Sequence, residues 1–222
     1  MGADYPLMNL SLPCRNAAAT RYILFLSLLP INYRQTRNFV NTPAVMVYSS
    51  MQEIFQLLAE YNRTTDREML GILGAQPPEL LSRPAGAYHG SILGVLNHLL
   101  QADVVWLRRF AHQLPELGPV AKELPDFKLR SLKDVVWDSL AVFQPVREKT
   151  DELLERAVQA IAPARYPEFL EYRNIKGEPQ RKVLWRTLLH LFNHQTHHRG
   201  QVAALLDQFG VENDYSNLIW KF

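Results

Sequence analysis

Residues 184–211 read LWRTLLHLFNHQTHHRGQVAALLDQFGV, and this stretch decides the fold class. Leucine, valine and phenylalanine recur in it at steps of three and four residues, the spacing of one buried face of an α-helix. Gly210 follows the last apolar residue of that face and suits the left-handed position after a helix, where Val211 can supply an apolar contact. The stretch therefore predicts a long amphipathic helix from near Leu184 to Phe209.

The same periodicity predicts two helices in the first part of the chain. The pattern SMQE at 50–53 resembles a capping box, which satisfies backbone N–H groups at a helix start, so the first of them should begin at Met51. It should end before Pro77-Pro78. The next helix is predicted from about Ser91 to near Pro115. The side chains of these two helices expected to face the core are Ile54, Leu58, Tyr61, Thr65, Met69, Ile72, Ile92, Val95, Leu96, Leu99, Ala102, Trp106 and Phe110.

A third helix is predicted after the segment 114–127, LPELGPVAKELPDF, which is expected to be a loop. The SLKD pattern at 131–134 should cap this helix, and Pro145 should bend it or divide it in two. A small hairpin is predicted between residues 169 and 185, because turn residues stand at its centre. Four amphipathic helices without a strand-rich region predict an all-α fold, a four-helix bundle with that hairpin before the last helix. The inward positions expected in the third helix are Val136, Leu140, Phe143, Leu154, Ala157 and Ile161.

The composition excludes several classes of protein. The 222 residues contain 24 Lys+Arg and 22 Asp+Glu, a net charge of +2 that is interspersed and argues against a nucleic-acid binder; a small-molecule partner is expected instead. Cys14 is the only cysteine and is expected to be an incidental thiol, so any metal site must rest on histidine or carboxylate. The apolar run from Tyr22 to Ile31 is far shorter than the roughly 20 residues of a membrane-spanning helix. No membrane partner and a cytoplasmic location are therefore expected.

Two regions are expected along the chain. Residues 1–49 are interpreted as an N-terminal extension, either poorly ordered or a mis-assigned start, with Met46 and Met51 as alternative starts. Residues 50–222 are interpreted as the helical domain.

Four of the seven histidines lie in the last helix, between His190 and His198. His194 and His198 are four residues apart, which places both imidazoles on one helix face where they can hold a single ion. They interrupt the apolar seam of the helix, and buried imidazoles need partners, so a third ligand is expected from a neighbouring helix. His98 is the natural candidate, because it lies beside the core-facing stripe of the second helix. The alternative is that His98 is a core histidine bonded to a backbone carbonyl, in a bundle without metal.

Other polar residues are candidates for the surroundings of this site. His89 and His112 have no special placement and are expected to be exposed. No catalytic residue and no general base can be named. The residues that could support the ligands or line the pocket are His190, His197, Asp103 and Arg199, with Glu60 and Glu68 as further acids; each has the alternative interpretation of a solvated or ion-paired helix residue.

Two stretches carry a family resemblance. NHLLQADVVWLRR at 97–109 and NHQTHHRGQVAALLDQFGV at 193–211 together resemble the DinB/YfiT-like superfamily of small metal-binding four-helix proteins. The resemblance extends from about Met51 to the C-terminus, while the first fifty residues have no counterpart. It implies an up-down-down-up bundle, frequent homodimers, and three facial ligands of one divalent ion, namely His98, His194 and His198.

The chemistry of such a site depends on its open position. Three neutral imidazoles leave at least one coordination position for water or substrate. Zinc is the first expectation, with nickel, iron or manganese as alternatives. The resemblance implies a thiol-dependent S-transferase that uses a low-molecular-weight thiol on small electrophilic or thiol-adduct substrates. A metal-dependent hydrolase and a non-catalytic, stress-associated metal-binding dimer are the alternatives.

Overall fold

A computed structural model describes residues 44–128, 131 and 133–222 of the chain, and these belong to one compact unit. The unit is mostly helical and contains a small two-stranded antiparallel sheet. The proposed extension up to residue 43, with Cys14 and the apolar run from Tyr22, lies outside the described residues. No helix in the described part of the chain combines the length and apolar character needed to cross a membrane.

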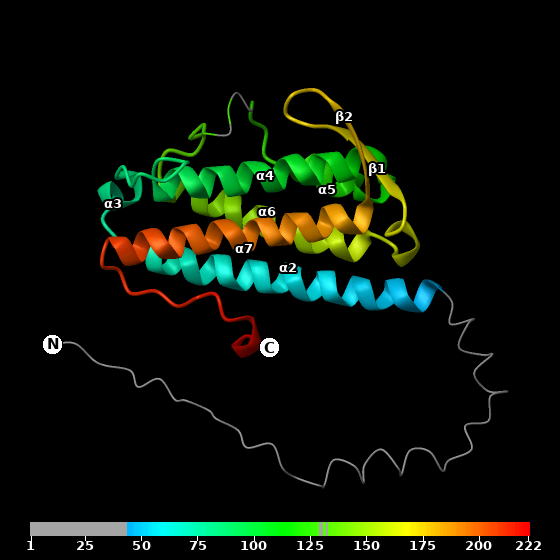
Figure 1. Ribbon diagram of the computed structural model, residues 1–222, viewed down its shortest axis with the longest axis horizontal. Coiled ribbons are helices and arrows are strands. Elements are labelled where there is room, and N and C mark those ends of the chain that lie inside the picture. The colour runs from blue at the N-terminus through cyan, green and yellow to red at the C-terminus, as the bar shows by residue number, and fades with distance from the viewer. Residues whose placement is uncertain (1–43, 129–130, 132) are drawn as a thin grey trace, which may run out of the picture. The chain divides into compact units, whose positions relative to one another are not determined.

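Long helices lie side by side in the unit, and short elements connect them (Figure 1). α2 packs against α6 and α4 packs against α7, with further contacts between the two pairs. The long helices are α2 (Ala44–Gly74), α4 (Ile92–Gln113), α6 (Leu140–Ala160) and α7 (Leu184–Gln208). The shorter elements are α3 (Pro78–Ser82), α5 (Gly118–Glu123), β1 (Phe169–Arg173), β2 (Pro179–Val183) and 3-10 turns at Pro115–Leu117, Pro163–Arg165 and Leu218–Trp220.

The ends of α4 and α7 form as the sequence predicts. The Ser91 hydroxyl accepts a hydrogen bond from the Gly94 N–H at 3.1 Å, which caps the start of α4. After α7, Gly210 has a φ of 74° and donates its N–H to the Asp207 carbonyl at 3.0 Å. The Val211 N–H bonds to the Leu206 carbonyl at 2.9 Å, which completes a Schellman motif. The predicted Gly210 termination is therefore confirmed.

The apolar core is built from the predicted faces with two exceptions. Ile54 is 55% exposed and Val136 is 39% exposed, so their predicted burial is wrong. In the turns around Ile54 the core-facing side chains are Phe55 and Ala59, while further along α2 Tyr61 and Thr65 are buried as predicted. Fully buried residues at predicted positions include Thr65, Ile92, Val95, Leu96, Phe110, Phe143 and Ile161.

Two predicted boundaries are also wrong, and a predicted division is absent. α2 begins at Ala44, so Ser50 is inside the helix; no glycine or proline between them interrupts the earlier turns. α6 continues through Pro145, so of the two predicted effects the division does not occur; Pro145 lies in the second turn, where its missing N–H removes one hydrogen bond close to the helix start. The segment 114–127 contains α5 and a 3-10 turn and is only in part a loop.

The predicted cap at 131–134 forms a turn, and α6 begins later, at Leu140. The reason is the buried Asn97 amide of α4: its oxygen accepts the N–H groups of Val136 and Trp137 at 2.8 and 2.9 Å. Its NH₂ group donates to the Trp137 carbonyl at 2.9 Å. Backbone groups held by a side chain in this way are not available to a helix.

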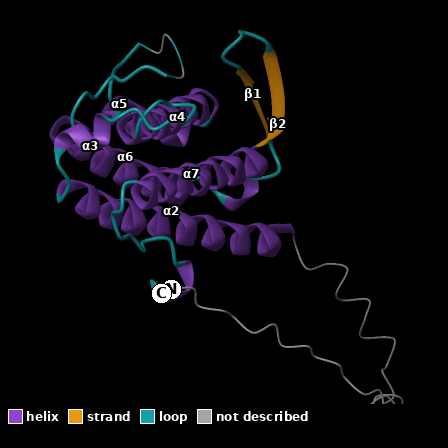
Figure 2. Ribbon diagram, turned by 60° about the vertical axis from the view of Figure 1, so that its left-hand side comes forward, coloured by secondary structure: helices purple, strands orange, loops and turns teal. Residues whose placement is uncertain are grey.

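The predicted hairpin between residues 169 and 185 is confirmed, and it stands at one end of the helices (Figure 2). Phe169 pairs with Val183 and Arg173 with Pro179, and Gly177 in the turn has a φ of 79°. The side chain of Gln113, the last residue of α4, accepts the Glu171 N–H at 2.8 Å and donates to the Phe169 carbonyl. α4 thereby pairs with the outer edge of β1 and fixes the hairpin to the helices.

Candidate metal centre

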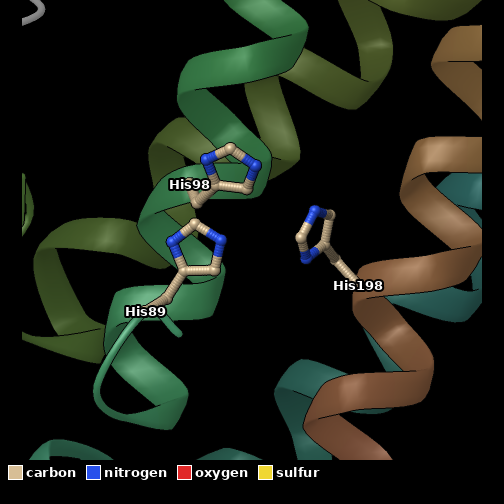
Figure 3. Close-up of side chains that lie close together, drawn as sticks. All are labelled: His89, His98 and His198. Carbon is tan, nitrogen blue, oxygen red and sulfur yellow. The ribbon is translucent and has the colours of Figure 1, made fainter. Parts of the chain in front are cut away.

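The structure brings His98 of α4 together with His194 and His198 of α7. The Nε2 atom of His194 lies 3.1 Å from the Nε2 atom of His98 and also 3.1 Å from that of His198. His98 and His198 are 8% and 6% exposed, and His194 is half-buried. In Figure 3 the rings of His98 and His198 project from the two helices toward the space between them. Residues 96 positions apart in the sequence therefore converge as expected.

The spacing of these nitrogen atoms suits a shared ion. Two imidazole ligands at about 2.0–2.1 Å from zinc in tetrahedral or octahedral geometry have their nitrogen atoms about 2.9–3.4 Å apart. Hydrogen bonds between the histidines do not explain both contacts well. A neutral Nε2 has either one proton or one lone pair, whereas His194 Nε2 lies close to two other nitrogen atoms. The donor set thus fits a divalent cation.

Gln201 sets the orientation of the His198 ring. Its side-chain oxygen lies 2.7 Å from His198 Nδ1, so Nδ1 donates a proton there and Nε2 presents its lone pair to the other histidines. The amide nitrogen of Gln201 lies 3.2 Å from Nε2 of the exposed His197. Sequence reasoning did not single out Gln201, although its position three residues after His198 places it on the same helix face.

The environment keeps His194 and His198 neutral. Burial, together with the neighbouring His198 and His98, lowers the pKa of His194 to about 3, and burial lowers the pKa of His198. Only a deprotonated imidazole nitrogen can act as a ligand. At neutral pH His194 and His198 therefore offer lone pairs without first having to lose protons.

His89 is the residue that the sequence interpretation misplaced. It was expected to be exposed, but it is only 9% exposed, and its ring stacks on His98 with centroids 4.1 Å apart and an angle of 21°. The turn before α4 contains Gly90 with a φ of 83°, and Figure 3 shows the His89 ring beside that of His98. Ligand atoms of His89, His98 and His198 all lie within 4.8 Å of one another, a group that could hold a metal ion. The glycine directly before the capping Ser91 was the available signal.

The other candidates lie at different distances from the histidines. His190 is exposed, and its ring is 5.9 Å from that of His194 and 5.5 Å from that of Trp106. His197 is exposed beside His198, at 4.9 Å between ring centroids. His112 is exposed, as expected. Glu60 and Glu68 are exposed, and Glu68 pairs with Lys221.

Asp103 and Arg199 belong to a buried group of charges next to the site. Asp103 accepts a hydrogen bond from Arg147 at 2.6 Å and another from Gln195, the residue after His194. Arg199 lies 3.5 Å from Asp66 and donates to Asn62. We call Asp66, Asp103, Arg147, Asp151 and Arg199 the ion-pair cluster; it connects all four long helices. Gln195 and Arg199 directly follow His194 and His198 on α7, so the cluster borders the part of α7 that contains the histidines.

Comparison with known proteins shows the family of the chain. The model of the DinB family matches residues 49–221. The chain belongs to the DinB family. Protein DinB of Bacillus subtilis (strain 168) is 25% identical over 154 residues, which cover 69% of this chain and 84% of the relative. No solved structure matches the chain significantly.

Membership in the DinB family and the converging histidines are compatible with metal binding. The family match begins at residue 49, inside α2, and reaches almost to the C-terminus. It therefore includes both helices that carry the histidines and the hairpin between α6 and α7.

Proposed function

We propose that this DinB-family chain binds one divalent metal ion through His98, His194 and His198 and acts as a metal-dependent thiol S-transferase on small electrophilic substrates. The observation that carries the proposal is the pair of 3.1 Å contacts between Nε2 atoms. An ion at about 2.1 Å from each ligand requires its donors to be within about 4.2 Å of one another. His194 meets this limit with both partners, which favours it over His89 as the third ligand.

A divalent ion in this position supplies a Lewis acid that binds a thiol as its thiolate and makes it nucleophilic at neutral pH. The residues of the chain prepare the site for this chemistry. Gln201 fixes the proton of His198 on Nδ1, and burial keeps His194 uncharged. His89 stacks on His98 and limits the rotation of that ring. In the transfer, a bond forms from sulfur to the electrophilic carbon, the bond from that carbon to its leaving group breaks, and the thiol proton passes to solvent.

Metal analysis of protein prepared without a histidine tag tests the ligand assignment. We expect about one zinc ion per chain in the wild type and less than about a tenth of that in His98→Ala, His194→Ala and His198→Ala, because losing one of three ligands removes most of the affinity. His197→Ala is the matched control from the same helix and should keep the ion. Full occupancy in His98→Ala or His194→Ala would refute the assignment.

His89→Ala separates the two sets of three histidines. We expect this variant to keep its ion, because His89 stacks on a ligand and is not itself one in the proposed site. Loss of the ion in His89→Ala together with retention in His194→Ala would show that His89, His98 and His198 are the ligands instead.

The reaction class needs a second measurement. In cobalt-substituted protein, a thiol that binds the ion produces a sulfur-to-cobalt charge-transfer absorption. We expect that signal with a low-molecular-weight thiol, and consumption of the thiol when an electrophile is added. A metal-loaded protein that gives neither signal favours the non-catalytic alternative. The up-down-down-up order of the helices and the homodimer, which the family resemblance implies, stay predictions.

A further inference from the structure

A cationic cavity lies between the C-terminal end of α4 and the hairpin. It has a volume of about 750 Å³ and is open on one side. Its described lining contains four arginines and one acid, so it has a strong positive charge although the whole chain is almost neutral. We call it the arginine cavity; its charged lining residues are Arg108, Arg109, Arg173, Arg181 and Glu171.

Two of the arginines are not neutralised by acids. Arg181 pairs with Glu171 at 3.4 Å, and Arg108 lies 3.5 Å from Asp126. Arg109, by contrast, donates to the Arg173 carbonyl at 3.0 Å, and Arg173 donates to the Gly177 carbonyl at 2.6 Å. Among the residues that the structure describes, neither has a carboxylate within 4.0 Å. Burial lowers the pKa of Arg109, which is the direction expected for a cation without a counter-ion.

Arg109 is held in a fixed position. Its guanidinium lies 4.7 Å from the ring centroid of Trp106 and 4.7 Å from that of Tyr172. The two rings contact each other, with centroids 5.2 Å apart, so they cover neighbouring parts of the guanidinium and not opposite sides. One N–H donates to the Arg173 carbonyl, and the remaining N–H groups can form hydrogen bonds with an oxyanion. The site is therefore organised before a ligand arrives.

A row of aromatic rings joins the arginine cavity to the histidines. Trp106, which contacts Arg109, lies 5.5 Å from His190, and His190 lies 5.9 Å from His194. Along α4, His98 and Arg109 are eleven residues apart. At 1.5 Å per residue this corresponds to about 16 Å, and eleven residues are just over three whole turns, so both side chains point to nearly the same side of the helix.

We propose that the arginine cavity is an anion subsite, in which Arg109 and Arg173 hold the carboxylate or phosphate end of an elongated small molecule whose other end reaches the histidines. Binding of the anion stands on the cavity alone. The statement that this molecule is the substrate or the thiol rests on the proposed function. Guanidinium groups bind carboxylate and phosphate by the same paired hydrogen bonds, so both kinds of end group fit.

Calorimetry on the metal-free full chain tests anion binding with two separate probes, propane-1,2,3-tricarboxylate and inorganic phosphate. We expect at least one probe to bind with one molecule per chain, and Arg109→Gln to weaken it about tenfold or more, because a charge-assisted contact is lost. Arg173→Gln is a second variant at an exposed strand position, where folding should be unaffected. Arg67→Gln, exposed on α2, removes the same charge away from the cavity and should change the affinity less than about twofold.

The outcomes separate this proposal from the metal proposal. Failure of both probes to bind, or equal weakening by Arg67→Gln and Arg109→Gln, overturns the anion subsite. His98→Ala should lose the ion and still bind the probe. Loss of probe binding in His98→Ala also overturns the subsite, because the anion would then depend on the histidines. Retained metal content in that variant refutes only the ligand assignment.

Discussion

At the scale of single residues, Gly94 decides how His89 reaches the site. A Cβ atom at this position would lie 3.1 Å from the carbonyl carbon of His89 and closer still to its oxygen. Because Ser91 caps the helix on the same turn, the backbone of residues 89–91 cannot move away without losing that hydrogen bond. Absence of a side chain at Gly94 is thus required for the turn that stacks His89 on His98.

We predict that Gly94→Ala destabilises the protein by about 1–3 kcal/mol, the usual range for a forced steric overlap in a packed region. Urea unfolding of the metal-free protein measures this. Gly71→Ala is the control: it lies in the exposed interior of α2 with no atom within 4 Å of the new Cβ. There alanine should stabilise by about 0.5–1 kcal/mol. Equal effects of the two substitutions would contradict the close approach.

At the scale of elements, the hairpin depends on α4. The edge of β1 has no third strand in the two-stranded sheet, and Gln113 provides the missing hydrogen-bond partners for Glu171 and Phe169. Arg109 does the same for the Arg173 carbonyl. A helix end therefore acts as the neighbouring strand, and this places the arginines of β1 and α4 around one cavity.

Gln113→Ala should loosen the hairpin without unfolding the helices. We expect the Glu171 amide to exchange its hydrogen at least about tenfold faster, while overall stability falls by about 0.5–1.5 kcal/mol, the contribution of one or two hydrogen bonds. Hydrogen exchange followed by NMR reports both. Gln144→Ala, which removes an exposed amide of α6 bonded to Glu148, should leave the hairpin amides unchanged. Unchanged exchange at Glu171 in Gln113→Ala would show that the hairpin is held by other contacts.

At the scale of the whole molecule, the ion-pair cluster connects the helices. Arg147 is buried and lies 2.6 Å from Asp103, 2.5 Å from Asp151 and 3.5 Å from Asp66. Burial raises the pKa of Asp103 and of Asp151, and the charge of Arg147 opposes that rise. Through these ion pairs Arg147 joins α6 to α2 and α4, close to the part of the molecule that contains the histidines.

Arg147→Met should destabilise the protein by about 3–5 kcal/mol at pH 7, because it leaves buried carboxylates without their cation. The difference in the free energy of unfolding between the wild type and Arg147→Met should become smaller as the pH is lowered from 7 toward 4. Without Arg147 the folded-state pKa values of Asp103 and Asp151 rise further above the ordinary value of 3.8, so the folded variant binds protons that the unfolded chain does not. Urea unfolding at several pH values measures both effects.

The control for this prediction is Arg63→Met, which breaks an exposed pair with Glu155. It should cost at most about 1 kcal/mol and show little pH dependence. A loss of similar size in Arg63→Met and Arg147→Met would contradict the special role of the buried cluster.

The sequence by itself determined the presence of the long helices and of the hairpin, and the histidines that its periodicity places on buried faces. The course of α4 and α7, the Gly210 termination, the hairpin and the approach of His98 to His194 and His198 follow from helical spacing and local turn residues. These features are local, or depend only on which helix face is apolar, and both kinds of information are present in a short stretch of residues.

Only the tertiary structure decided what depends on contacts between distant segments. Asn97 binds backbone groups about 40 residues away, and α6 therefore begins later than predicted. His89, which was predicted to be exposed, lies against His98 because of the turn at Gly90. The arginine cavity likewise needs α4 and β1 at a fixed distance, which Gln113 sets. The physical reason is that a side chain's hydrogen-bond partner is chosen by packing, and no local pattern in the sequence encodes which backbone group will be within reach.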